Sequence, residues 1–337
     1  MSDYDGLARS GASCFVIGNY AYVGLGYNGK TQGDSRNSDL WVYDVTRDAW
    51  KQVAALPDNI GNSRSHAASF VVGGKGYVCA GVSEINKNIE YLKDLVEYTP
   101  CSQPFSNDCT RTEGNYWTTK KSLPEDAGPR SEAIGIALDK KGYGYVGGGK
   151  IDGGSQLKDF YRYDPVADSW TQLTGIGGSK RSGALTFVAN DKIYVCLGIS
   201  NGYYLTDLQM YDDATDTWLK KEEMRNATDQ SFDDKYSGME RANGVAFELN
   251  GKIYITLGIS GSSNKSTWEY EPATDRWIQR TAFEGSARSD AVAFTLYDGT
   301  RQRAFVATGG SSTNRYDDVW EFKPTEEKND NDNGNIY

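Results

Sequence analysis

Short apolar stretches separated by polar turns recur along the whole chain. One repeating unit begins with an arginine, reaches a small residue three positions later, and then enters a run rich in β-branched and aromatic side chains. Such short runs, bounded by turn residues, predict buried strands. The unit occurs six times, with its arginine at Arg9, Arg64, Arg130, Arg181, Arg241 and Arg288.

Each unit contains further predicted strands. A second apolar run follows the first after a turn and ends in glycine, as at residues 20–26. The third strand ends in an aromatic residue, and a Trp marks the fourth, as in the pair Tyr43 and Trp50. Four short strands per unit at a period of roughly 50 residues are typical of the blades of a β-propeller. The sequence therefore predicts six blades.

The chain resembles the kelch-repeat family, whose propeller also forms the central domain of galactose oxidase. The resemblance runs from Arg9 to about Lys323 and rests on the Tyr of strand three, the Trp of strand four and paired glycines such as Gly147 and Gly148. It implies an all-β, six-bladed propeller with four antiparallel strands per blade. We expect this domain to span residues 1–323, followed by an acidic, polar tail at 324–337.

The ring needs an additional strand to close. Asn329 stands in the sixth unit where the other units place Trp, whereas residues 2–10 resemble residues 281–289, which follow the fourth strand of unit five. We therefore expect the N-terminal strand to complete blade six, and the natural chain to extend upstream of Met1 with a further Trp. The alternative is that the last two residues, Ile336 and Tyr337, return to close the ring.

The six copies help to separate structural residues from site residues. Arg, Trp and Tyr recur in nearly every unit and are predicted to serve the fold, with Arg bridging neighbouring blades through carbonyls or carboxylates. The position two residues after each Arg varies instead, at the start of the innermost strand where the funnel opens. Different polar groups in one register suit an asymmetric polar ligand; the alternative is a hydrated channel mouth. These residues are Gly11, His66, Glu132, Gly183, Asn243 and Asp290.

The loops between strands two and three open on the same face and carry exposed Tyr and Asn side chains. Aromatic rings and amides suit sugars, and Tyr also anchors protein contacts. The long segment 222–240 between units four and five is predicted to be a surface loop, with a lid over the funnel as the alternative. The predicted ligand-binding residues are His66, Glu132, Asn243, Asp290, Tyr27, Tyr203 and Tyr204.

Composition excludes several function classes. The chain has 36 Lys and Arg against 46 Asp and Glu, a net charge of −10. An acidic chain without a long basic run repels phosphate backbones, so we expect no nucleic-acid partner. No apolar run reaches the roughly 18 residues of a transmembrane segment. The one His, His66, is too few for a multi-ligand copper or zinc centre, so we expect no metal and no cofactor.

The five cysteines fall into two groups. Cys14, Cys79 and Cys196 lie in strand-like runs and are predicted to be buried free thiols. Cys101 and Cys109 flank a short polar insertion, where a disulfide would close a loop and indicate an oxidising compartment. Although no signal segment is visible in the chain, this pair and the habit of the family favour an extracytoplasmic setting. We also expect a monomer.

The sequence is compatible with three functions. The first is a non-enzymatic recognition module that binds a glycan or protein ligand at the funnel face. The alternative is a carbohydrate-active enzyme, such as a sialic-acid epimerase or mutarotase, in which Glu132 and Asp290 act as general acid and base. The resemblance implies that alternative, because an N-acetylneuraminate epimerase is a kelch propeller. A third possibility is a scaffold domain whose funnel face is covered by another chain.

Overall fold

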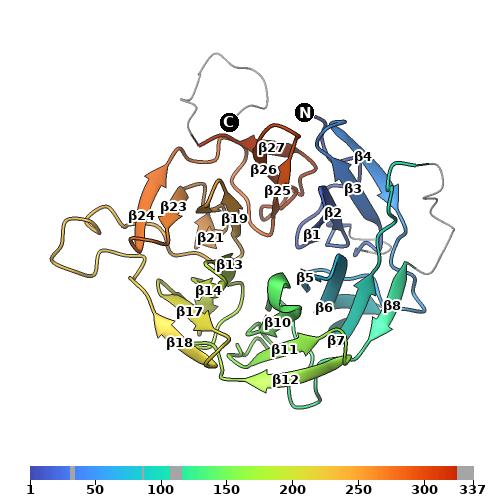
Figure 1. The fold of residues 1–337 in the computed structure, drawn as a ribbon, viewed down its shortest axis with the longest axis horizontal. Coiled ribbons are helices and arrows are strands. Elements are labelled where there is room, and N and C mark those ends of the chain that lie inside the picture. Colours follow the sequence, from blue (N-terminus) through green and yellow to red (C-terminus); the bar gives the residue numbers. More distant parts are fainter. Residues whose placement is uncertain (31–34, 86, 107–115, 325–337) are drawn as a thin grey trace.

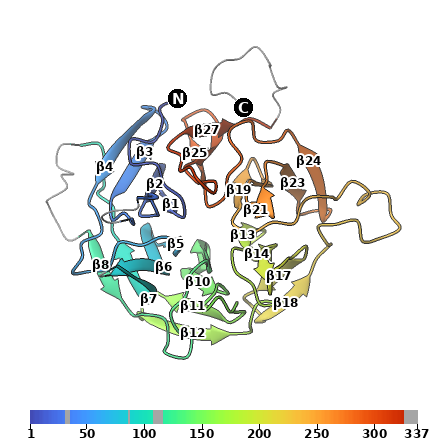
Figure 2. The same cartoon turned by 180° about the vertical axis from the view of Figure 1, so that it is seen from behind.

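The computed structural model describes residues 1–30, 35–85, 87–106 and 116–324. These residues form the predicted all-β, six-bladed propeller, with the blades arranged around a central channel (Figure 1). Sequential strands in each blade pair antiparallel, and the first strand of each blade lies nearest the centre in both views (Figure 2).

The first three blades follow the predicted order of strands. They consist of β1 (Ser13–Ile17), β2 (Tyr20–Gly24), β3 (Leu40–Asp44) and β4 (Ala49–Val53); β5 (Ala68–Val72), β6 (Lys75–Ile85), β7 (Asn88–Tyr98) and β8 (Trp117–Lys120); and β9 (Ile134–Leu138), the 3-10 turn η1 (Asp139–Lys141), β10 (Tyr143–Gly147), β11 (Phe160–Asp164) and β12 (Ser169–Leu173).

The last three blades differ in small additions and in the outer strand. Blades four and five each have an additional two-stranded hairpin between their second and third strands. The strands are β13 (Leu185–Ala189), β14 (Lys192–Cys196), β15 (Ile199–Ser200), β16 (Tyr203–Tyr204), β17 (Leu208–Asp212) and β18 (Thr217–Lys220); β19 (Val245–Leu249), β20 (Lys252–Thr256), β21 (Ile259–Ser260), β22 (Ser262–Ser263), β23 (Thr267–Glu271) and β24 (Arg276–Arg280); and β25 (Val292–Tyr297), β26 (Gln302–Ala307) and β27 (Val319–Phe322).

The ring closes between blades six and one through the N-terminal segment. The backbone N–H of Gly309 donates to the carbonyl of Arg9 at 2.8 Å, and that of Tyr4 donates to the carbonyl of Asp317 at 2.8 Å. Within the described part of the chain, blade six has three strands, and the N-terminal residues join it through one bridge, Arg9 to Tyr316, rather than as a regular strand. Ile336 and Tyr337, the alternative closing residues, lie outside the described residues.

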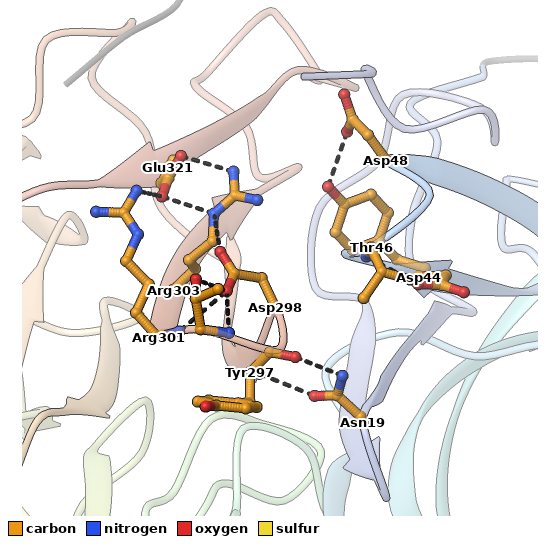
Figure 3. Close-up of polar contacts among 11 residues, drawn as sticks. Asn19, Asp44, Thr46, Asp48, Tyr297, Asp298, Arg301, Arg303 and Glu321 are labelled. Atoms are coloured by element: carbon orange, nitrogen blue, oxygen red, sulfur yellow. Dashed lines mark hydrogen bonds and ion pairs between the residues drawn. The ribbon is translucent and has the colours of Figure 1, made fainter.

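Polar groups tie the turns together at the same seam (Figure 3). Asn19, in the β1–β2 turn, donates its amide to the carbonyl of Tyr297 at 2.5 Å and accepts the N–H of Tyr297 at 2.8 Å. Within blade six, Arg303 on β26 makes two 2.8 Å hydrogen bonds to the carboxylate of Glu321 on β27. The first and last blades are therefore joined by specific contacts as well as by apolar packing.

The recurring arginines are structural, as predicted. All six are almost completely buried, and each of five donates both terminal nitrogens to the two oxygens of an aspartate in its own blade. The aspartate directly precedes the third strand in four of these blades and lies within it in blade two. Arg64, for example, contacts Asp94 at 2.8 and 2.6 Å. In blade five the acid is replaced by Ser266, and burial lowers the pKa of Arg241 to about 10.

The contact between neighbouring blades is made by the arginine main chain rather than by its side chain. A glycine N–H at the end of strand two donates to the carbonyl of the next blade's arginine in all six blades, as from Gly26 to Arg64 at 2.7 Å. These glycines have positive φ, and an added Cβ on Gly26 would lie 3.0 Å from a backbone oxygen. In blade six Gly309 holds this position.

The Tyr and Trp side chains pack where the blades meet. Tyr43 and Trp50 have ring centroids 4.9 Å apart, and the Tyr43 hydroxyl donates to Asp48 at 2.8 Å. Segment 222–240 projects outward from the ring (Figure 1) and is anchored in the core by buried Met224, Tyr236 and Met239. It is therefore a surface loop, as predicted, and does not cover the channel.

Candidate functional site

Six equivalent residues form the rim of the central channel. Each has a left-handed backbone, with φ between 53° and 61°. The N–H of each donates to the carbonyl of its counterpart in the preceding blade at 2.8–3.1 Å, which makes a closed circle of six hydrogen bonds. The rim residues, in order around the ring, are Gly11, His66, Glu132, Gly183, Asn243 and Asp290.

The left-handed conformation makes the four larger rim residues informative. It suits glycine, whereas for other residues it costs roughly 1–2 kcal/mol, less for Asn and Asp. His66 and Glu132 bear this cost in full, at φ values of 54° and 53°. Because strained residues gather at functional sites when the surrounding structure holds them, the observation directs attention to these side chains.

His66 and Asp290 form a hydrogen-bonded pair across blade one. Nε2 of His66 lies 3.3 Å from Oδ1 of Asp290, and the side chains are 25% and 18% exposed. The second oxygen of Asp290 accepts the Ser289 hydroxyl at 2.7 Å, and Nδ1 of His66 lies 3.1 Å from the Ser65 hydroxyl. A Cβ on Gly11 would lie 2.8 Å from the imidazole, so His66 can occupy this place only because its neighbour is glycine.

The pair is electrostatically coupled. Burial lowers the pKa of His66, but the hydrogen bond and charge of Asp290, with the charge of Glu132, outweigh it and leave the pKa above its ordinary value. Burial raises the pKa of Asp290, and the hydrogen bond and charge of His66 reverse this, so that pKa lies below its ordinary value. Each group therefore stabilises the charged form of the other.

Glu132 forms a second pair on the next rim position. Its Oε1 lies 2.6 Å from Nζ of Lys150, and burial lowers the pKa of Lys150 less than the charge and hydrogen bond of Glu132 raise it. Asn243 lies over Gly183, where an added Cβ would come within 2.0 Å of its amide oxygen. Each glycine of the rim thus makes room for the side chain of the following rim residue.

The rim encloses a small cavity rather than a deep pocket. Its volume is about 140 Å³, and its walls combine the six rim residues with the small side chains that follow them, such as Ala67 and Ala291. This space suits a few water molecules. A ligand larger than a few waters would therefore lie at the mouth of the channel, with the rim side chains beneath it.

Two wider circles of residues lie outside the rim on the same face. In every blade the residue before the rim pairs with a second residue, and that residue pairs with a third. The second and third residues lie between strands two and three, except in blade two, where the longer strands β6 and β7 include them. We call these the middle circle and the outer circle. The middle circle is Tyr27, Val82, Lys150, Ile199, Ile259 and Gly310, and the outer circle is Arg36, Tyr91, Gln156, Tyr204, Ser263 and Arg315.

The predicted tyrosines take different places in this arrangement. Tyr27 lies in the middle circle, with the guanidinium groups of Arg36 and Arg315 at 5.5 and 5.0 Å from its ring centre. The Tyr204 hydroxyl accepts the Gly261 N–H at 3.1 Å and so links blades four and five. Tyr203 is 78% exposed at the hairpin tip. The structure thus brings His66, Glu132, Asn243 and Asp290 together and leaves the tyrosines further out.

Several charged groups on this face were not identified from the sequence. Lys150 is the partner of Glu132, and Arg36 and Arg315 contact Tyr27. The repeat alignment could have identified Lys150. It directly follows the glycines that end strand two, where the other blades carry Tyr, Val, Ile or Gly. Arg36 and Arg315 fall in loops of unequal length, where the repeat alignment gives no register.

The remaining predictions concern the cysteines, metal binding and membrane-spanning segments. Cys14, Cys79 and Cys196 are free; Cys79 and Cys196 are buried as predicted, whereas Cys14 is only partly buried at its surface. Burial of the thiol nevertheless raises the pKa of Cys14 to about 12. Cys109 lies outside the described residues, so its disulfide with Cys101 stays a prediction. In the described part of the chain no three His, Cys, Asp or Glu residues gather as a metal site would require. Nor does any helix in these segments have the length and apolar character to cross a bilayer.

The known proteins that resemble this chain include enzymes. No family model matches the chain. A stretch of 174 residues is 25% identical to N-acetylneuraminate epimerase from Shigella sonnei (strain Ss046), to that from Escherichia coli (strain K12), and to N-acetylneuraminate epimerase 2 from Escherichia coli O6:H1. The match covers 50% of this chain and 39% of each relative, so it spans less than half of those proteins.

The solved structure of YjhT shares the fold. It superposes with a TM-score of 0.73 over 96% of this chain and 97% of that chain, at 14% identity. The propeller architecture is thus supported by the described strands and by this neighbour. The finer assignment to the kelch type stays a prediction.

One prediction made from the sequence is wrong. We expected first a non-enzymatic recognition module for a glycan or protein ligand. The relatives instead carry the name of an enzyme, N-acetylneuraminate epimerase, which supports the alternative, a sialic-acid epimerase or mutarotase. The error arose because varied polar groups around a rim are compatible with both binding and catalysis, and the sequence did not show which groups form pairs.

Proposed function

We propose that the protein is a sialic-acid epimerase or mutarotase of the kelch type, acting at the mouth of the central channel. The observation that carries this proposal is the arrangement of two rim pairs on successive blades, His66 with Asp290 and Glu132 with Lys150. One pair couples an imidazole to a carboxylate, which raises the pKa of the imidazole, and the other pair presents a carboxylate held by a lysine. The names of the relatives point to the sugar.

Interconversion of sugar anomers requires two proton transfers and no oxidant. A base takes the proton of the anomeric hydroxyl while an acid protonates the ring oxygen, and the bond from the anomeric carbon to the ring oxygen breaks. Rotation of the resulting carbonyl and reversal of both transfers close the ring on the other face. Each proton therefore returns to the sugar, and the enzyme ends the cycle in the protonation state in which it began.

The rim residues match these roles. We assign the acid to the His66 imidazolium and the base to the Glu132 carboxylate, while Asp290 is a positioning residue that orients and stabilises the imidazolium. Lys150 holds the Glu132 carboxylate in place at 2.6 Å. Asn243, folded over Gly183, is placed to hydrogen-bond a sugar hydroxyl or amide. The setting we propose is extracytoplasmic.

The test is an exchange measurement by nuclear magnetic resonance. Anomer exchange of N-acetylneuraminate is followed with and without the protein, and with Glu132→Gln and Asp290→Asn. We expect acceleration by the wild type and a loss of about 10²–10⁴-fold in Glu132→Gln, because one proton transfer is removed. Exchange at the uncatalysed rate with folded wild-type protein would contradict the proposal.

A further inference from the structure

We propose that Arg315, together with Arg36 and the ring of Tyr27, forms the subsite that binds the carboxylate of an acidic sugar. The inference rests on the proposed function and deepens it, since it assigns the sugar's charged group to the seam between blades six and one. The observation behind it is a guanidinium on the funnel face that pairs with no carboxylate of the described residues, in a chain with a net charge of −10.

The charges of the rim and its two circles do not cancel. Asp290 pairs with His66 at 3.3 Å, and Glu132 with Lys150 at 2.6 Å. Arg36 pairs with Glu84, from β6, at 3.2 Å. Arg315 alone among these cations lies more than 4.0 Å from every carboxylate of the described residues. This set of charged groups therefore has a surplus positive charge, although the chain as a whole has a net charge of −10.

The surroundings of Arg315 hold its side chain in place without neutralising it. One terminal nitrogen donates to the carbonyls of Ser311 and Asn314, both at 2.8 Å. Its guanidinium lies 5.0 Å from the centre of the Tyr27 ring, and Nε is buried without a hydrogen-bond partner within the described segments. Neutral carbonyls and an aromatic ring stabilise a cation while leaving its charge uncompensated.

Arg315 differs from the six structural arginines in its polar partners. Five of the six buried arginines use both terminal nitrogens on an aspartate, so the fold regularly supplies a carboxylate where a guanidinium serves packing alone. Arg241 lacks one but is sealed in the core on Ser266. Arg315 is half-buried on the face where the substrate would bind, which is where an unpaired guanidinium can bind a ligand carboxylate through its planar fork.

The position of Arg315 relative to the rim fits a single sugar. Arg315 pairs with Gly310, and Gly310 pairs with Ser289, the sequence neighbour of Asp290. Arg315 therefore lies two strand spacings, roughly 10 Å, from the innermost strand. Its charge is close enough to help lower the pKa of Asp290. A sugar whose ring lies over the rim pairs could thus direct its carboxylate toward blades six and one.

The test compares a charged ligand with its neutral counterpart. Dissociation constants are measured by calorimetry for N-acetylneuraminate and for its methyl ester, with wild type, Arg315→Gln and Arg315→Lys. We expect wild type to bind the acid at least about tenfold more tightly than the ester, and Arg315→Gln to lose that preference, because a charge-assisted hydrogen bond is lost. Arg315→Lys keeps the charge but not the fork, so partial recovery is expected.

The matched control is Arg301→Gln, which removes an exposed arginine paired with Glu321 in the β25–β26 turn (Figure 3). It should bind acid and ester as wild type does, and thermal melting shows that each variant is folded. Equal binding of acid and ester by wild type, or an unchanged preference in Arg315→Gln, would overturn the subsite even if anomers are interconverted. Failure of both binding and interconversion would overturn the subsite and the proposed function together.

Discussion

Two circles of six residues, only two positions apart in the sequence, follow opposite rules. The arginines at position one of each repeat are identical and buried, and five are paired in the same way with an aspartate. The rim residues at position three share a backbone conformation and a hydrogen-bonded circle, yet their side chains differ from blade to blade. The fold needs the same arginine in each copy, whereas at the rim it needs only the backbone, which leaves the side chains free to serve chemistry.

The largest expected effect concerns the arginine circle. Asp94→Ala leaves the buried Arg64 charge without its carboxylate, and we expect a loss of about 3–5 kcal/mol in the free energy of unfolding. The matched control is Ser266→Ala in blade five, where Arg241 has no carboxylate to lose and a smaller change is expected. Urea unfolding of both variants measures the difference, and equal losses would show that the aspartate has no special role.

A smaller effect is expected where the rim meets its glycines. Gly11→Ala would drive a Cβ into the His66 ring, whereas Gly18→Ala has the same φ of 59° and no atom within 4 Å. Both variants should lose roughly 1–2 kcal/mol through backbone strain, measured by urea unfolding. Only Gly11→Ala should also slow anomer exchange, because it displaces the imidazole. Slowing of exchange to the same extent in both would mean that strain, and not the position of His66, matters.

Stability should depend on pH through the His66–Asp290 pair. The folded-state pKa of His66 lies above its ordinary 6.5, so its contribution to stability is complete below pH 6.5 and is lost as the pH rises through the folded-state value. Thermal melting from pH 6 upward should therefore show a decline in wild type that is weaker in Asp290→Asn. The other charged groups facing His66 are Glu132 and Lys150. An identical decline in the two proteins would contradict the pairing.

The smallest effect is expected at Tyr203, which was predicted to bind ligand but lies 78% exposed at a hairpin tip. Tyr203→Ala should change the free energy of unfolding by no more than about 0.5 kcal/mol. Its effect on the dissociation constant of N-acetylneuraminate, measured by calorimetry, should also be small. A large loss of affinity would extend the site beyond the rim and the seam at Tyr27.

The sequence allowed the fold to be predicted because its repeated signals concern local packing. The arginine, the Tyr–Trp pair and the glycine after strand two each recur in register, and each has one structural role. Even so, the arginine side chain pairs within its own blade, and only its carbonyl contacts the preceding blade. Which blade the side chain and the carbonyl each face depends on their direction in three dimensions, and the spacing of residues along the sequence does not give that direction.

The site could be predicted only in part, for a related reason. The rim positions follow from the repeat, but the pairing of His66 with Asp290 crosses blade one and depends on the absence of a side chain at Gly11. Similarly, Arg315 reaches Tyr27 from the opposite end of the chain, through the closure of the ring. Contacts that depend on ring closure and on side-chain direction have no signature in a single sequence.

The central claim is that rim side chains are retained for chemistry at some cost to the fold. Glu132→Gly tests it most directly, because glycine relieves the left-handed strain at φ 53° while removing the proposed base. Unfolding free energy and the N-acetylneuraminate exchange rate are measured on the same sample. The account predicts stability within about 1 kcal/mol of wild type, or higher, with exchange reduced at least about 100-fold. A marked loss of stability with exchange unchanged would contradict it.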